Sequence, residues 1–406
     1  MMRRQSLTVN QLARYVAFAA ATPVITIMLA CSTAPPPTVA TPTITPNNTI
    51  FFGSVEVAMS SGTPDAEICY TTDGSTPTAT HGVPYAGSFP LTNSATIRAA
   101  AYLADGTISE VSTTSYTRID HTFGIWGSST TNVWAVGGYS WDWSASEAEA
   151  SRYDGVFWSS GTVPPGIGIL SAVWGSSAED VFAVGPQGTI IHYDGTSWSI
   201  QDSGTTEDLN AVWGSASNDV FAAGGNGIIL HYNGATWAGM VSGVIKNLTG
   251  LYGLAPNAIM VVGADGTILT YNGAVWAPEV ANTNNYLFAA WGSNPTNAYA
   301  VGTGGTIVQW NGVAWNVMVS GTPQDLRGVW GVGSEVFAVG DAGTILHYNG
   351  AAWAAMTSGT TSPLQGVWGG PASNDVFAVG LCGTILHFNG ITWSQPWGTG
   401  GVSCAE

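Results

Sequence analysis

One phrase repeated along the chain constrains its fold more than any other feature. It reads "HYNGAAW" at residues 347–353 and occurs seven times with small changes. A second phrase, written "VWGSSAEDVFAVG" at residues 173–185, also occurs seven times. After a longer first interval, its aromatic anchors recur every 38 or 39 residues: Trp126, Trp174, Trp213, Tyr252, Trp291, Trp330 and Trp368. A period near forty with four strand-like segments is typical of a β-propeller blade. Residues 121–406 therefore predict a seven-bladed β-propeller.

Each repeat divides into four expected strands. In one copy these are "LNAVWG", "DVFAAG", "GIILHY" and a strand that starts at Trp237. Asp-Gly or Asn-Gly separates the third strand from the fourth in all seven copies, and this pair accepts the positive φ angles of a tight hairpin turn. We expect the Trp that follows each turn to pack between neighbouring blades. A hairpin that cannot bury its own face is then buried by its neighbours in the ring.

The repeats resemble two known kinds of propeller repeat. The pattern "AVG..GTI" followed by a turn and a Trp is similar to neuraminidase-type (Asp-box) repeats, and more closely to photosystem II assembly-factor repeats. The Asp-box itself is shortened here, because the Ser before its Asp and the residue between Asp and Gly are missing. The resemblance implies the fold, whereas such repeats are found with many functions.

A small domain at residues 46–118 precedes the propeller. Short apolar strands alternate with turns, a spacing that predicts a β-sandwich. The segment "CYTTDGSTPT" with "VPYAGSFPL" resembles the chitobiase C-terminal type of immunoglobulin-like domain, through Tyr70, Thr72, Asp73, Gly74, Ser75, Pro77, Thr78 and Tyr85. That family mostly supplies accessory domains of secreted and surface proteins. The expected fold class is therefore all-β, a propeller plus a sandwich.

The N-terminus is interpreted as an export signal. Basic residues precede the apolar run "VAFAAATPVITIMLA", which is short for a membrane span. "MLACS" resembles the lipobox of bacterial lipoproteins, which implies lipidation at Cys31. An ordinary secretory signal is the alternative, because Met28 and Leu29 depart from the usual pattern. Residues 1–31 are the expected signal and residues 32–45 a Pro-rich linker. We expect export, with a lipid anchor as the only membrane attachment, at the outer membrane or cell surface.

Composition argues against several functions. The net charge of -17 would repel phosphate backbones, so nucleic acid is not an expected partner. The propeller offers only Arg152 and Arg327, too few for the arginine clamp of a sialidase. Asp180, Asp219 and Asp375 share one repeat position, which favours turn capping over catalysis. The set His192, His231, His347 and His387 also shares one position, which favours hydrogen bonding over a metal site. No metal or cofactor is expected.

Two departures from the repeat are candidate sites. The first blade carries an insertion, residues 137–152, whose candidate contact residues are Tyr139, Trp141, Asp142 and Trp143. Aromatic rings beside a carboxylate suit a glycan or a protein partner. A loop that merely packs on the neighbouring blade is the alternative. In the last blade, Cys382 and Cys404 are positioned to form a disulfide, which export makes plausible.

These features favour a surface-anchored, non-catalytic binding or scaffold protein with a glycan or protein partner. A secreted glycan-active hydrolase with an accessory domain is one alternative. Two carboxylates that face each other across the axial face would support it. An extracytoplasmic assembly factor is the other alternative.

Overall fold

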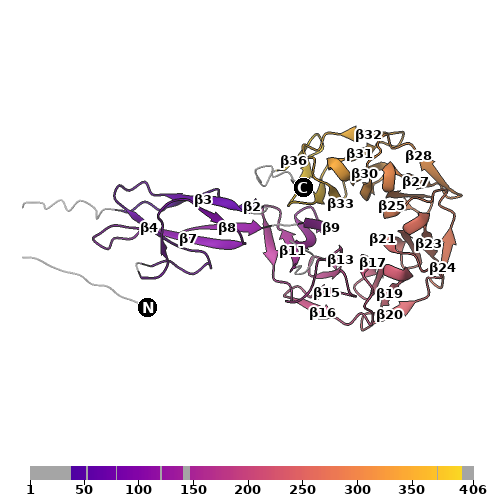
Figure 1. The fold of residues 1–406 in the computed structure, drawn as a ribbon, viewed down its shortest axis with the longest axis horizontal. Coiled ribbons are helices and arrows are strands. Elements are labelled where there is room, and N and C mark those ends of the chain that lie inside the picture. The colour runs from indigo at the N-terminus through magenta and orange to yellow at the C-terminus, as the bar shows by residue number, and fades with distance from the viewer. Residues whose placement is uncertain are drawn as a thin grey trace, which may run out of the picture. The chain divides into compact units, whose positions relative to one another are not determined.

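The structure is a computed structural model, which describes residues 38–51, 54–78, 80–118, 121–139, 147–372 and 374–395. Every regular element in these ranges is a β-strand or a one-turn 3₁₀ helix, as expected for an all-β chain (Figure 1). Within the described residues, no helix is long and apolar enough to span a membrane.

The N-terminal domain is a sandwich of two sheets. The three-stranded sheet has the order β1 (Thr43–Thr45), β3 (Val55–Ser60), β6 (Phe89–Leu91). The five-stranded sheet has the order β2 (Thr49–Phe51), β8 (Ser112–Arg118), β7 (Ala95–Tyr102), β4 (Glu67–Thr71), β5 (Val83–Pro84). Alternate residues of both sheets, such as Val57 and Ile97, point into one shared core and are fully buried. The fold class predicted for this segment is confirmed.

The sandwich starts earlier than the sequence indicated. Strand β1 pairs with β3, and Ile44 of β1 is buried in the core together with Val39. Residues 32–45 were assigned to a linker because they are rich in Pro and Thr. Val39 and Ile44 of its second half belong to the sandwich core instead.

Seven four-stranded antiparallel sheets form the propeller, each from consecutive strands (Figure 1). The first is β9 (His121–Ser129), β10 (Asn132–Tyr139), β11 (Glu147–Tyr153), β12 (Trp158–Gly161). The second is β13 (Ala172–Ser177), β14 (Asp180–Val184), β15 (Ile190–Tyr193), β16 (Trp198–Gln201). The third is β17 (Leu209–Ala216), β18 (Asp219–Gly224), β19 (Ile229–Tyr232), β20 (Trp237–Met240). The fourth is β21 (Leu248–Ala255), β22 (Ala258–Gly263), β23 (Ile268–Tyr271), β24 (Trp276–Glu279).

The remaining three sheets follow the same plan. The fifth is β25 (Leu287–Asn294), β26 (Asn297–Gly302), β27 (Ile307–Trp310), β28 (Trp315–Met318). The sixth is β29 (Leu326–Val332), β30 (Glu335–Gly340), β31 (Ile345–Tyr348), β32 (Trp353–Met356). The seventh is β33 (Leu364–Gly369), β34 (Val376–Gly380), β35 (Ile385–Phe388), β36 (Trp393–Ser394). The 3₁₀ turns η1 (Gly225–Gly227), η2 (Ala264–Gly266), η3 (Thr303–Gly305) and η4 (Asp341–Gly343) link second to third strands.

Hydrophobic pattern sets the place of each strand in a blade. The second strand is buried on both faces, because sheets pack against it from either side; "DVFAAG" of β18 has five buried residues in a row. The fourth strand lies at the outer rim, and only its first residue, Trp237 in β20, is buried. The first strands line the axis and contact one another around the ring, with β33 against β9. The four strands expected in each repeat are confirmed.

The turn between the third and fourth strands differs from the expected one. Tyr193 pairs with Trp198, which leaves a four-residue loop. Gly195 has φ +90°, but Asp194 is not at positive φ, so only one residue of the pair uses the left-handed region. Asp194 Oδ1 instead accepts the backbone N–H groups of Thr196 and Ser197, both at 2.9 Å. Hydrogen bonds from Ser197 and Thr196 lower the pKa of Asp194. The Asx turn, not a mirror-image turn, explains this Asp or Asn.

The outer tryptophans hold adjacent blades together, as expected from the repeat. Trp198 of the second blade lies edge-on to Trp134 of the first, with ring centroids 5.3 Å apart and an interplanar angle of 86°. Trp237 of the third blade meets Phe182 of the second in the same way, at 6.0 Å and 79°. Each outer ring is therefore packed against the second strand of the preceding blade.

The inner tryptophans lean the other way, over a glycine of the following blade. A Cβ added at Gly127 would lie 2.6 Å from Cη2 of Trp368, so a side chain has no room there. The same arrangement recurs at five more glycines: Gly175 under Trp126, Gly214 under Trp174, Gly253 under Trp213, Gly331 under Trp291 and Gly369 under Trp330. The ring closes through this packing, because the last sheet holds only strands β33–β36.

Candidate functional site

An aromatic vestibule opens at one mouth of the axial channel. The seven inner aromatic residues surround a cavity of about 700 Å³: Trp126, Trp174, Trp213, Tyr252, Trp291, Trp330 and Trp368. All except the buried Trp291 are half-buried, so their rings are available to a ligand. The described lining has no charged side chain, and its polar side chains beyond the aromatic ones are Ser128, Ser129 and Ser293. We call this cavity the vestibule. It suits apolar and aromatic groups.

A smaller cavity, of about 210 Å³, lies at the other mouth of the channel. Its one charged residue is Arg327, whose Nη2 lies 2.9 Å from Asp341 Oδ2 and 3.4 Å from Asp325 Oδ2. The guanidinium also lies over the Phe288 ring, 4.6 Å from its centroid. The hydrogen bond to Asp341 raises the pKa of Arg327. This arginine is already neutralised, so it offers no free clamp for a carboxylate.

The two propeller arginines belong to separate blades. Arg152 lies on β11 of the first blade, near Glu179, with its Nη2 3.6 Å from Glu179 Oε1. Arg327 lies on β29 of the sixth. Neither cavity of the axial channel is lined by a pair of facing carboxylates among the described residues. The feature that would have supported a glycan hydrolase is therefore not seen there.

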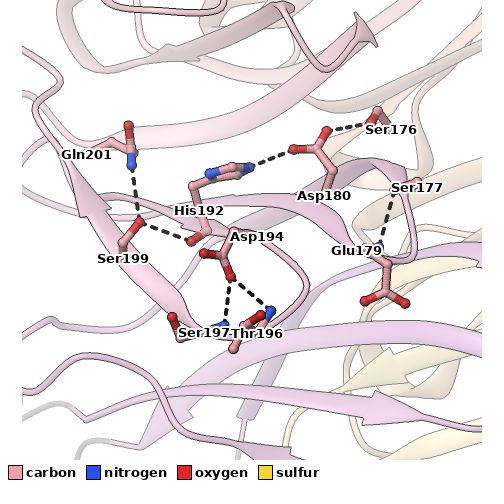
Figure 2. Close-up of polar contacts among 10 residues, drawn as sticks. All are labelled: Ser176, Ser177, Glu179, Asp180, His192, Asp194, Thr196, Ser197, Ser199 and Gln201. Carbon is pink, nitrogen blue, oxygen red and sulfur yellow. Dashed lines mark hydrogen bonds and ion pairs between the residues drawn. The ribbon is translucent and has the colours of Figure 1, made fainter.

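Serine, aspartate and histidine form a repeated chain of hydrogen bonds (Figure 2). In the second blade, Ser176 donates to Asp180 Oδ2, and Asp180 Oδ1 lies 2.6 Å from His192 Nε2. Aspartate is the central member, so the serine hydroxyl bonds to a carboxylate and not to the imidazole base. A nucleophilic serine needs histidine at the centre to take its proton. The chain ties the turn after the first strand to the third strand, a structural role.

The full chain recurs in the third blade, and a carboxylate-histidine pair recurs in the sixth and seventh, so each histidine is held within its own blade. His231 bonds to Asp219 at 2.7 Å and His387 to Asp375 at 2.6 Å. Each ring also stacks on the phenylalanine of its own blade, as His231 does on Phe221 at 4.4 Å. Within the residues that the structure describes, no three His, Cys, Asp or Glu side chains are grouped to hold a metal ion.

The candidate residues from the sequence are only partly placed. Strands β10 and β11 pair as far as Tyr139 and Glu147, so both ends of the expected insertion, residues 137–139 and 147–152, belong to the sheet, and the segment between them connects the second and third strands of the first blade. Trp141, Asp142 and Trp143 lie outside the described residues, as do Cys31 and Cys404. Nothing is described of the Tyr139 side chain. Their proposed roles stay predictions.

Cys382 is placed at the joint between the last blade and the first. Its side chain is buried, at 7% exposure. Its backbone N–H donates to Nδ1 of His121 in β9, at 3.0 Å. The last described residue, Gln395, and Cys382 border the same hollow.

Comparison with solved structures shows the fold. The fold is that of a β-propeller. YCF48 bound to D1 peptide is similar with a TM-score of 0.55 and 17% identity, over 66% of this chain and 91% of that one. YCF48 from Cyanidioschyzon merolae has a TM-score of 0.54 and 16% identity, over 66% and 95%. The WD40 propeller domain of Doa1 has a TM-score of 0.54 and 12% identity, over 68% and 93%.

Sequence comparison gives a match only within the sandwich domain. The "Fn3 associated" family model matches residues 57–116. No curated protein sequence matches the chain. The sequence had identified the seven inner aromatics as blade anchors but not as the lining of one cavity. Their equal spacing was the signal, since equivalent positions on the axial strands form a ring.

Proposed function

We propose that this chain is an exported, non-catalytic binding protein that holds an apolar segment of a partner protein in the vestibule. The observation that carries the proposal is the ring of six tryptophans and one tyrosine around an uncharged cavity of about 700 Å³. Large aromatic side chains are enriched where proteins bind proteins, because they bury much area at little entropic cost. A YCF48 propeller has been solved with a peptide bound, which supports a peptide ligand for this fold.

A protein segment fits the vestibule better than a glycan does. Sugar recognition needs several polar groups to bond the hydroxyls beside an aromatic platform. Apart from the aromatic residues, three serines supply the polar side chains of the lining. The lipid anchor at Cys31 and the outer-membrane or cell-surface location complete the proposal, on the strength of the export signal and the lipobox resemblance. An assembly factor would be this same binding protein acting on an immature partner.

A library of displayed random peptides tests the proposal directly. Purified full chain would be compared with Val332→Arg, which places a charged side chain in the vestibule lining. Val241→Arg is the matched control, because Val241 is 89% exposed and lies outside that lining. We expect the wild type and the control to select the same apolar peptides and Val332→Arg to select none of them.

Two outcomes would contradict the proposal. If all three proteins select the same peptides equally well, the peptides bind outside the vestibule. Failure of the wild type to select peptides, together with binding on a polysaccharide array, would reassign the partner to a glycan. In that case the first-blade insertion, with Trp141 and Trp143, becomes the site to substitute.

A further inference from the structure

The fourth blade departs from the repeat at several positions together. Where the third blade has the hydrogen-bonded chain Ser215, Asp219 and His231, the fourth has Leu254, Ala258 and Thr270. Two aromatic positions change as well: Tyr252 stands in place of the inner Trp, and Met260 in place of the Phe, Tyr or Trp of the second strand. The fifth blade keeps a polar chain, since Gln309 donates to Asn297 at 3.0 Å. Among the blades, this combined loss is confined to the fourth.

All five changed residues line one cavity between the fourth and fifth blades. Its volume is about 240 Å³ and its wall is mostly apolar. From the fourth blade come Tyr252, Leu254, Ala258, Met260 and Thr270, and from the fifth come chiefly Trp310 and Trp315. We call this cavity the interblade pocket. At four of these five positions the third blade has a larger side chain: Trp213, Asp219, Phe221 and His231.

The inner tyrosine explains part of the hollow. At six joints, a tryptophan ring fills the space over the glycine of the following blade. At the joint between the fourth and fifth blades, the nearest atom to a Cβ on Gly292 is Ala298 Cβ, at 3.1 Å, and no Tyr252 atom is among the three nearest. The tyrosine therefore leaves space between the two blades.

The interblade pocket adjoins the vestibule. Tyr252, Leu254 and Gly292 line both cavities. A peptide that lies in the vestibule is therefore next to the interblade pocket, and the residues shared by the two cavities carry no charge. A buried apolar anchor of this kind commonly carries much of the affinity of an interface.

The far wall of the interblade pocket carries a carboxylate. Glu279 is half-buried and accepts a hydrogen bond from Thr270 Oγ1, at 3.1 Å from Oε1. The three Lys and Arg residues of the propeller are already engaged: Arg152 with Glu179, Lys246 with Asp265, and Arg327 with Asp341. No described Lys, Arg or His forms an ion pair with Glu279. A partly desolvated carboxylate favours a cationic ligand group.

We propose that the interblade pocket is the anchor site for a large apolar side chain of the partner segment that lies next to a Lys or Arg, with Glu279 receiving the cation. The inference rests on the proposed function and names the partner chemistry at one place of the same site. The apolar wall selects Leu, Met or Phe over polar residues, and the carboxylate selects a basic neighbour over an acidic one. The strongly acidic chain as a whole favours the same basic segments.

The test replaces four residues of the pocket with those that the third blade has at the same repeat positions. The quadruple variant Leu254→Ser, Ala258→Asp, Met260→Phe and Thr270→His restores the repeat, so it is expected to fold and unfold like the wild type. Peptides selected from the displayed library on the wild-type full chain would be synthesised and titrated into each protein. We expect the quadruple variant to bind them about 30-fold more weakly, the loss of one buried anchor. Glu279→Gln should bind basic peptides about fivefold more weakly and lose the preference for them.

A second readout locates the anchor directly. With ¹³C-methyl-labelled methionine, the signal of Met260, assigned by Met260→Leu, should shift on addition of a selected peptide. The signal of Met318, on the outer strand of the fifth blade and outside the pocket lining, serves as the control and should not move.

Each outcome decides the inference separately from the proposed function. If the quadruple variant binds as the wild type does while Val332→Arg does not, the pocket is not the anchor and the vestibule proposal stands. If selected peptides lack basic residues and Glu279→Gln binds normally, the assigned ligand chemistry is wrong. If the wild type selects no peptide, both proposals fail.

Discussion

Trp368 in the seventh blade covers Gly127 in the first, so closely that a methyl group on Gly127 would lie 2.6 Å from Cη2 of the indole. Strands β33 and β9 meet at this joint without sharing a sheet. The ends of the ring are thus held by side-chain packing, and residues at this joint are expected to influence the stability of the whole propeller.

Gly127→Ala should destabilise the propeller. The added methyl group has to displace the half-buried indole ring of Trp368, and overpacking of this kind costs about 1–3 kcal/mol. The free energy of unfolding, measured by urea denaturation followed through tryptophan fluorescence, should fall by that amount.

Gly292→Ala is the matched control, because Gly292 holds the same repeat position beneath Tyr252. Its nearest neighbour would be Ala298 Cβ at 3.1 Å, a contact that a small shift relieves. Its effect should be clearly smaller than that of Gly127→Ala. Equal effects of the two substitutions would show that the tryptophan contact is not what excludes a side chain.

Trp198→Ala should weaken the joint between the first and second blades. The buried ring packs edge-on against Trp134, and removal of a buried aromatic side chain costs about 3–5 kcal/mol. Thermal unfolding followed by circular dichroism would report the loss. Ile200→Ala on the same strand should change little, since Ile200 is 59% exposed. A small effect at Trp198 would contradict its role between the blades.

Tyr252 should make stability depend on pH at the alkaline end. Burial raises the pKa of Tyr252 to about 12, from an ordinary value near 10 in the unfolded chain. The neutral phenol is favoured in the folded state, so this contribution is complete below pH 10 and is lost as the pH rises towards 12. The free energy of unfolding should fall more steeply over this range in the wild type than in Tyr252→Phe. Parallel curves would show that Tyr252 ionises normally.

The pairing of Cys382 with Cys404 stays a prediction that mass spectrometry can check. A closed loop of this size stabilises a chain by about 3 kcal/mol in the entropy model. Alkylation of the unfolded protein without reductant should leave both cysteines unmodified, and Cys404→Ser should lower the free energy of unfolding by about that amount. Alkylation of both residues before reduction would rule the bond out.

The sequence predicted the propeller because its signals are local and repeated. The stretch "VFAA" of the second strand is apolar without interruption, which indicates a strand covered on both faces, and a Trp such as Trp237 marks the start of each outer strand. Two predictions needed correction. Asp194 caps its turn through its side chain, and Ile44 shows that the sandwich begins within the supposed linker. Both depend on hydrogen bonds or packing that no short sequence window contains.

The interblade pocket was visible in the sequence only as the imperfect copy "LYGLAPNAIM". Leu254, Ala258 and Thr270 look like separate substitutions along the chain. The structure brings them to one side of the fourth blade, opposite Trp310 and Trp315 of the fifth. Which face of a blade meets which neighbour follows from the twist and order of the sheets, and periodicity does not report it.

Each sheet of the propeller comes from one uninterrupted stretch of about forty residues, with none of its strands borrowed from the other end of the chain. Tandem copying or excision of one such stretch in the gene would therefore add or remove a whole blade and leave no orphan strand behind. The circumference of the ring is set by how many units are encoded, and a lineage could alter it in one recombination event. An altered unit such as the fourth blade would then be passed on whole, together with the residues that it contributes to the interblade pocket.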